Sequence, residues 1–218
     1  EQLFLALKTV CGFTASETAA LFFMSEDALS QSLSRAKRKL KAQTGEIARF
    51  PTRFALKDRF SQLLKVIYLM FAWGYLPRRG DQLFREDVCK EALRLSEGLL
   101  AQTDDQASDH HALHALLLFQ ISRLPARANA TGQLITLDVQ ERSLWDHEMI
   151  FYGFQQLEVA KTSETLTRYH LEAGIASIHA QARTWEETNW IAIARLYELL
   201  NTQAPSLAVM INWAVSLM

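Results

Sequence analysis

Residues 12–43, "GFTASETAALFFMSEDALSQSLSRAKRKLKAQ", carry the signals from which the fold class follows. Thr14 and Glu17 have the spacing of a capping box, in which a hydroxyl and a carboxylate each accept a hydrogen bond from a backbone N–H at the start of a helix. Ser25 is suited to cap a second, longer helix. A short capped helix, a turn and a longer helix form the pattern of a helix-turn-helix unit.

The second of these helices is predicted to bury one face and to expose a strongly basic one. Leu29, Leu33, Ala36 and Leu40 recur at helical spacing, so they lie along one side of the helix. The other positions carry five basic side chains: Arg35, Lys37, Arg38, Lys39 and Lys41. Such a run is either a solvated helix surface or a surface that meets a polyanion such as DNA.

If the polyanion is DNA, the exposed side chains of this helix divide by their chemistry. The amide of Gln31 can pair with the edge of an adenine, which is a contact that reads sequence. Ser30 and Ser34 can reach either a phosphate or a base. Three basic side chains are better placed for phosphates, which position a protein without reading sequence: Arg35, Lys37 and Arg38.

The remaining periodic segments of the 218-residue chain are also helical, so we predict an all-α protein. Residues 1–45 are expected to form the helix-turn-helix module, and residues 46–54, which contain Pro51, a linker. Residues 55–218 are expected to form a larger, solenoid-like domain of antiparallel helix pairs. The segment "GQLITL" at 132–137 is the exception, because its composition favours a short extended stretch.

Charge and cysteine content limit the class of partner and the compartment. Residues 1–53 hold eight Lys and Arg against five Asp and Glu, whereas the rest of the chain holds 15 against 19. We therefore expect only the first part to meet a polyanion. Cys11 and Cys89 lie among apolar residues, which fits reduced thiols and a cytoplasmic location. The apolar runs are shorter than a membrane span, so no membrane partner is predicted.

The larger domain offers one candidate site for a ligand or a partner. Arg123, Arg127, Arg142 and Trp145 combine cationic groups with an indole and could line a pocket between helices. For Arg142 and Trp145 the alternative is an ion-paired helix start beside a packed indole.

The histidines are the other polar residues that draw attention. His110 and His114 are four residues apart and could share a metal, but a solvated helix start is favoured and no metal site is predicted. His179 lies on an apolar helix face and is expected to be a hydrogen-bonded core residue. The chain contains no HExxH motif, no phosphate-binding glycine loop and no nucleophile elbow. We therefore predict that the protein is not an enzyme and that it has no cofactor and no catalytic residue.

Residues 12–43 resemble region four of bacterial sigma factors of the extracytoplasmic-function class, which are RNA polymerase factors of the sigma-70 type. In that family a recognition helix ends in an Arg-Ala-basic-basic-basic-Leu run, here Arg35 to Leu40. Further motifs resemble, in order, the helical tetratricopeptide-like extension of one subgroup: "IYLMFAWGY", "DVCKEALRLSEGL", "SRLPAR", "QERSLWD", "YHLEAGIASIHA", "TNWIAIARLYELL" and "APSLAVMINWAVSL". Ser32 stands where the family usually has an arginine.

The resemblance implies a function in transcription initiation. The helix-turn-helix would bind the upstream promoter element and the flap of the polymerase β subunit, while the extension would regulate the factor or dock a partner. It also implies a polymerase-binding region before residue 1 and more helical repeats after Met218, so we expect the chain to be a fragment. Two other functions stay open for the extension: a small-molecule sensor or enzyme, and a protein-interaction scaffold.

Overall fold

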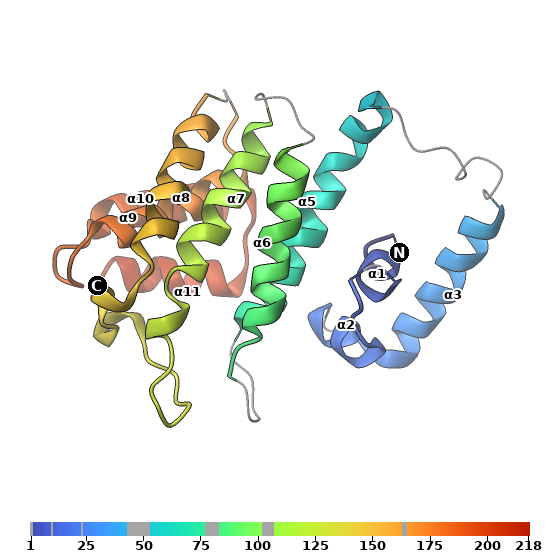
Figure 1. Cartoon of the computed structure of the whole chain (residues 1–218), viewed down its shortest axis with the longest axis horizontal. Coiled ribbons are helices and arrows are strands. Elements are labelled where there is room, and N and C mark those ends of the chain that lie inside the picture. The colour runs from blue at the N-terminus through green and yellow to red at the C-terminus, as the bar shows by residue number, and fades with distance from the viewer. Residues whose placement is uncertain are drawn as a thin grey trace. The chain divides into compact units, whose positions relative to one another are not determined.

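The computed structural model describes residues 2–9, 11–22, 24–42, 53–76, 83–101, 107–162 and 165–218. Within these ranges every regular element is a helix, which confirms the all-α prediction (Figure 1). The chain divides into two compact units, Glu1–Trp73 and Gly74–Met218. Helix α5, Arg53–Tyr75, crosses the boundary between them.

The first unit begins with three helices: α1 (Gln2–Thr9), α2 (Ala15–Leu21) and α3 (Glu26–Ala42), of which α2 and α3 are the two predicted helices of the helix-turn-helix. The predicted capping box is present at the start of α2. The N–H of Glu17 donates to the Thr14 hydroxyl at 3.1 Å, and the N–H of Thr14 donates to the Glu17 carboxylate at 2.8 Å. The Ser25 hydroxyl accepts a hydrogen bond from the N–H of Ala28 at the start of α3, as its position predicted.

A small apolar core holds the three helices together. Ala19 of α2 packs against Leu29 and Leu33 of α3, and partly buried residues of the first two helices and the turns close the cluster. Gly12 between α1 and α2 has a φ of 73°, a left-handed conformation that glycine adopts without a steric cost. This turn brings α2 and α3 against α1, so α3 buries one face and leaves the other in solvent.

One expectation about α3 changes. Leu40 is 43% exposed, so the buried stripe of α3 ends at Ala36, because the helix extends beyond the small core that covers its first half. Helix α5 begins at Arg53, earlier than the predicted start of the larger domain at residue 55. Residues 43–52, which include Pro51 and most of the predicted linker 46–54, lie outside the described residues, so the predicted boundaries stay a prediction.

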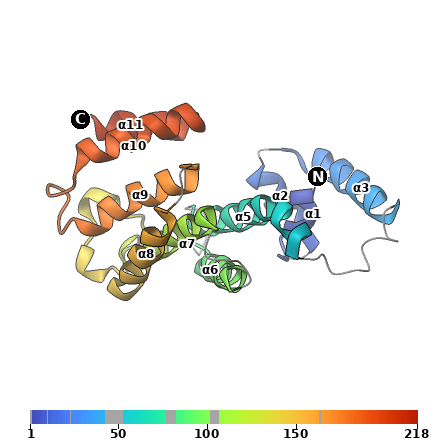
Figure 2. The same cartoon turned by 90° about the horizontal axis from the view of Figure 1, so that it is seen from above.

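The second unit contains six α-helices in its described part: α6 (Glu86–Leu100), α7 (Ser108–Ile121), α8 (His147–Ala160), α9 (Arg168–Gln181), α10 (Trp190–Gln203) and α11 (Leu207–Ser216). Helix α7 is central, because it contacts α6, α8 and α9 and buries residues on all its sides. Figure 2 shows α9 and then α10 and α11 stacked in turn away from α7 and α8. This order matches the predicted succession of helix pairs.

The connection between α7 and α8 is the irregular part of this unit. It contains three short 3₁₀ helices, Leu124–Ala126, Leu137–Val139 and Arg142–Leu144. The predicted extended stretch at 132–137 forms one isolated antiparallel bridge, between Ala128 and Leu134, in place of a strand. The last 3₁₀ helix places Arg142 just before the start of α8. There Arg142 meets Arg123 and Trp145, and these three residues are called the arginine cluster below.

In the described residues, no helix combines the length and the apolar character needed to cross a bilayer.

Candidate functional site

The surface of α3 carries every side chain predicted to contact DNA. These six side chains are all exposed: Ser30, Gln31, Ser34, Arg35, Lys37 and Arg38. The opposite side of the helix is buried at Leu29, Leu33 and Ala36. The core therefore fixes which residues face solvent, and a single helix surface presents uncharged hydrogen-bonding groups followed by cations.

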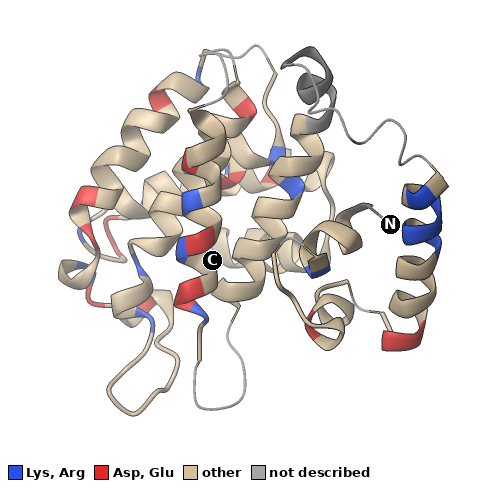
Figure 3. Cartoon of the chain, turned by 45° about the vertical axis from the view of Figure 1, so that its right-hand side comes forward, with Lys and Arg blue, Asp and Glu red and all other residues tan. Residues whose placement is uncertain are grey.

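Charge along α3 is ordered. Glu26 and Asp27 lie in the first turn, where the positive end of the helix dipole stabilises them. The basic residues follow from Arg35 onward, and Figure 3 shows them at the opposite end of the helix from the acidic pair. The uncharged side chains Ser30 and Gln31 lie between these two groups. A helix of this kind can bring a short polar segment to base edges while its cationic end lies on phosphates.

Ser32 is part of the packed face. Its side chain is 7% exposed, and its hydroxyl accepts a hydrogen bond from Nη2 of Arg35 at 3.1 Å. The position at which the resembled family usually has an arginine therefore supports the helix and orients a neighbouring cation in this chain.

In the second unit, three of the four predicted site residues meet. The guanidinium carbons of Arg123 and Arg142 lie 5.1 Å and 5.2 Å from the centre of the Trp145 indole, which is 3% exposed. Cation–π attraction and burial hold the three side chains together. The indole N–H and the Nε of Arg123 are buried without a hydrogen-bond partner among the described residues.

Arg142 joins the start of α8 to the end of α9. Its Nη1 donates to the main-chain oxygens of His179 at 2.6 Å and Ala182 at 2.7 Å, and its Nη2 donates to the Thr188 hydroxyl at 3.1 Å. These carbonyls lie in the last turn of α9 and at its C-cap, where a cation is favourable. Burial is the main cause that lowers the pKa of Arg142, and the nearby guanidinium of Arg123 lowers it further. The alternative predicted for this segment, an ion-paired helix start, is therefore wrong for Arg142.

Arg127 does not belong to this cluster, so the four residues predicted to line one pocket do not do so. Its guanidinium carbon lies 3.7 Å from the centre of the Tyr75 ring and 4.1 Å from that of Phe84. Its Nη1 donates to the Tyr75 carbonyl oxygen at 2.8 Å. Burial lowers its pKa. Arg127 therefore ties the end of α5 to the connection after α7.

His179 completes the arginine cluster, and its role differs from the expected one. The side chain is buried, as predicted, but its Nδ1 has no hydrogen-bond partner among the described residues. Burial, with the charges of Arg123 and Arg142 adding to it, lowers the pKa of His179 to about 3. The imidazole packs edge-on against Trp190, with 5.4 Å between ring centroids.

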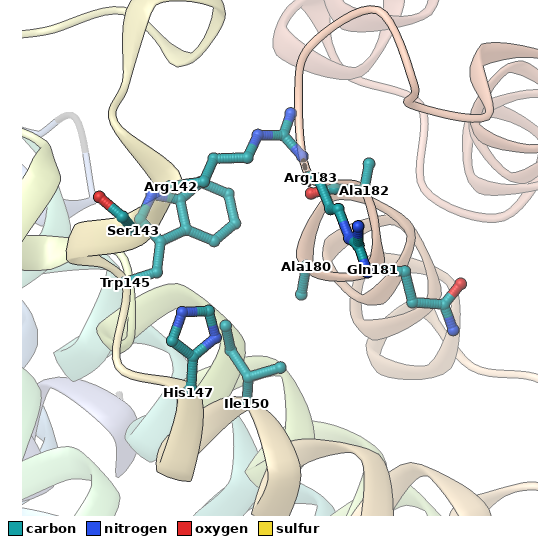
Figure 4. Close-up of a pocket in the computed structure, with 9 residues that line it drawn as sticks. All are labelled: Arg142, Ser143, Trp145, His147, Ile150, Ala180, Gln181, Ala182 and Arg183. Carbon is teal, nitrogen blue, oxygen red and sulfur yellow. Dashed lines mark hydrogen bonds between the residues drawn. The ribbon is translucent and has the colours of Figure 1, made fainter.

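Beside this cluster lies a cavity of about 330 Å³, drawn in Figure 4. The residues that line it come from the start of α8, the end of α9 and the segments beside them: Arg142, Ser143, Trp145, His147, Ile150, Ala180, Gln181, Ala182 and Arg183. His147 and Arg183 were not predicted. They lie 36 residues apart in the chain, and no local spacing pattern indicates that the fold brings them to one cavity.

The histidines of α7 are structural. His110 and His114 are buried, so the predicted solvated helix start is wrong for both. Nδ1 of His114 lies 2.9 Å from the Ser96 hydroxyl, and Nε2 of His110 lies 3.0 Å from the Ser96 carbonyl oxygen. Burial lowers the pKa of each ring to about 4. The described residues contain no group of three or more His, Cys, Asp or Glu side chains arranged to hold a metal ion.

This chain is similar to one protein family and to one curated protein, and neither has an assigned activity. Residues 59–161 match a family of unknown function, DUF6596. The chain is 35% identical over 216 residues to an uncharacterized protein of Rhizobium meliloti (strain 1021). The alignment covers 99% of this chain and 51% of that protein, so the chain spans about half the length of the curated relative it matches. No solved structure gives a significant match.

Proposed function

We propose that this chain is part of an alternative bacterial RNA polymerase sigma factor of the extracytoplasmic-function class, in which α3 contacts promoter DNA. The observation that carries the proposal is the single exposed surface of α3, which presents Gln31 and two serines beside a basic end while its other face packs on α1 and α2. The capped short helix α2, the turn and the longer α3 follow in the order of a helix-turn-helix, a motif that places its second helix in a major groove. The resemblance of residues 12–43 supplies the class.

The same proposal gives the chain its partners and compartment. Promoter DNA and the core RNA polymerase, through its β flap, are the partners of the first unit. The second unit regulates the factor or docks an unidentified partner. The site of action is the bacterial cytoplasm.

The test is the salt dependence of duplex binding, measured on the full-length factor bound to core polymerase. Changing Arg35, Lys37 and Arg38 to alanine should weaken binding at every salt concentration. It should also lower the slope of log affinity against log salt by about 0.9 for each phosphate that the variant no longer neutralises.

The matched control removes three exposed cations from the second unit, Lys90, Arg94 and Lys161. This control changes the net charge by the same amount but leaves α3 intact, so it should keep both the affinity and the slope. Equally weakened binding in the two triple variants would show a nonspecific charge effect. Unchanged promoter affinity in the α3 variant would leave α3 as a solvated helix surface and would overturn the proposal.

A further inference from the structure

The cavity beside Trp145 has two walls and a cationic bridge between them. Figure 4 shows Trp145, His147 and Ile150 on one side and the end of α9, from Ala180 onward, on the other. The side chain of Arg142 extends from the first side to the second, where its hydrogen bonds to α9 hold it. The cavity is therefore a gap between two helix ends whose separation is set by a single arginine.

The lining is cationic and lacks a protein counter-ion. Arg142, Arg183 and His147 contribute basic groups, and among the described residues that line the cavity none is Asp or Glu. Neither arginine forms an ion pair with any residue in the described part of the chain. A partly enclosed cluster of cations without a carboxylate favours the entry of an anion.

Arg142 keeps hydrogen-bonding capacity for such an anion. A guanidinium has five N–H donors, and three of those of Arg142 are used by His179, Ala182 and Thr188. The Nε–H and one N–H of Nη2 take no part in these three hydrogen bonds. Because its other contacts fix the guanidinium in place, binding an oxyanion here costs little side-chain entropy.

Apart from Ser143 and Gln181, the other residues that line the cavity are apolar, and they set the size and character of the ligand. Trp145, Ile150, Ala180 and Ala182 surround a volume of about 330 Å³, which is at the lower end of the range for small-molecule sites. Inorganic anions would leave these surfaces without contacts. We propose that this cavity binds a small organic acid, whose carboxylate or phosphate lies against Arg142 and Arg183 and whose flat apolar body lies between Ile150 and Ala180.

Glu186 and Glu187 are the carboxylates that compete with such a ligand. They follow the cavity in sequence and raise the pKa of Arg142 by a smaller amount than the main causes lower it. The Glu187 carboxylate accepts a hydrogen bond from the backbone N–H of Arg183 at 3.3 Å. Since neither carboxylate lies within ion-pair distance of Arg142, the guanidinium stays available to a ligand.

The proposal is tested by calorimetric titration of the intact chain with four probes. Benzoate and phenyl phosphate carry both the anion and the ring, benzamide carries a ring without charge, and inorganic phosphate carries charge without a ring. We expect Kd values of about 1 mM or lower for benzoate or phenyl phosphate, and at least tenfold weaker binding of benzamide and inorganic phosphate. No heat with either organic anion, or equal affinity for phosphate with and without the ring, would overturn the proposal.

Variants then locate the site. Arg183→Gln should weaken benzoate about fivefold to tenfold, because it removes one charge-assisted contact from an exposed residue on which the fold does not depend. Arg195→Gln is the matched control, since this exposed arginine of α10 does not line the cavity. Ala180→Leu should fill the apolar part and abolish binding, with circular dichroism to verify folding. Equal effects of the two arginine changes would place binding outside the cavity and refute the assignment.

Discussion

The guanidinium of Arg127 stacks on the ring of Tyr75, with 3.7 Å between its carbon and the ring centre, and donates to the carbonyl oxygen of the same residue. One side chain thus fixes both the backbone and the side chain of the last residue of α5. The sequence alone placed Arg127 in a ligand site with Arg142, whereas its contacts are those of a structural residue.

Replacing Arg127 with lysine should therefore destabilise the protein. Lysine keeps the charge but loses the planar group that stacks on Tyr75 and Phe84, so we expect the free energy of unfolding to fall by about 1–2 kcal/mol. Urea denaturation monitored by circular dichroism measures this change. The matched control Arg94→Lys, on the exposed face of α6, should change stability by less than about 0.5 kcal/mol. If Arg127→Lys leaves the free energy of unfolding unchanged, the stacking on Tyr75 and Phe84 contributes nothing to stability.

The contact between α7 and α8 depends on a glycine. A Cβ at Gly153 would lie 2.7 Å from Cε1 of Phe119, a ring that is 1% exposed and cannot easily move. Gly153→Ala should lower the free energy of unfolding by about 1–3 kcal/mol, because it overpacks the core. The control Gly98→Ala lies in α6 with nothing within 4 Å of the added carbon. It should raise stability by about 0.5–1 kcal/mol, since alanine is the better helix former.

Thermal unfolding of the two glycine variants gives a direct comparison. If Gly153→Ala is as stable as the parent chain, α7 and α8 do not pack as closely at Gly153 and Phe119 as the structure has them. The contrast between the two positions separates the effect of packing from that of helix propensity, because both variants gain the same methyl group.

How well the sequence predicts a contact in this protein depends on how far apart the two residues lie along the chain. Thr14, Glu17 and Ser25 cap helices through contacts three residues away, so spacing alone located them. Leu29 and Leu33 were located by helical periodicity. Leu40 follows the same period but is exposed, because burial also needs a partner, and the core of three short helices does not extend that far.

The cavity of the second unit was only partly predictable. Arg142 and Trp145 are three residues apart, so their proximity followed from the chain. Arg183 joins them only because α9 ends beside the start of α8, and that packing is not encoded in any local pattern. The prediction that His110 and His114 lie at a solvated helix start is wrong for the same reason. Helix α7 has polar residues at its start, but other helices cover it.

Four buried histidines predict loss of stability in acid, because burial also lowers the pKa of His170. Burial lowers the pKa of His110 and His114 from 6.5 to about 4 and that of His179 to about 3. The unfolded chain binds protons at these rings near pH 6.5, whereas the folded chain keeps them neutral. Their stabilising contribution is therefore complete above pH 6.5 and is lost as the pH falls towards 4.

Urea denaturation between pH 7 and pH 4 tests this sign. The free energy of unfolding should decrease with falling pH, and the decrease should be smaller in a His114→Gln variant, which keeps a polar partner for Ser96 without a titrating ring. Identical pH dependence in the parent chain and the variant would contradict a neutral buried state of His114. The carboxylates titrate mainly at lower pH, so the interval between 6.5 and 5 is the informative one.

Gln31 offers a prediction that separates sequence reading from charge, and it rests on the proposed function. Its side chain is exposed on α3, between the acidic first turn and the basic end. Gln31→Ala should cost about 1–3 kcal/mol of discrimination between the preferred promoter and a variant at one base pair, and should leave the salt slope unchanged. Competition binding of the full-length factor with core polymerase measures both quantities.

Ser30→Ala, the control, removes a single hydroxyl beside Gln31 and should have the smaller effect. A loss that is uniform across sequences would assign Gln31 to phosphate contacts, and no change in discrimination at any base pair would exclude it from the interface.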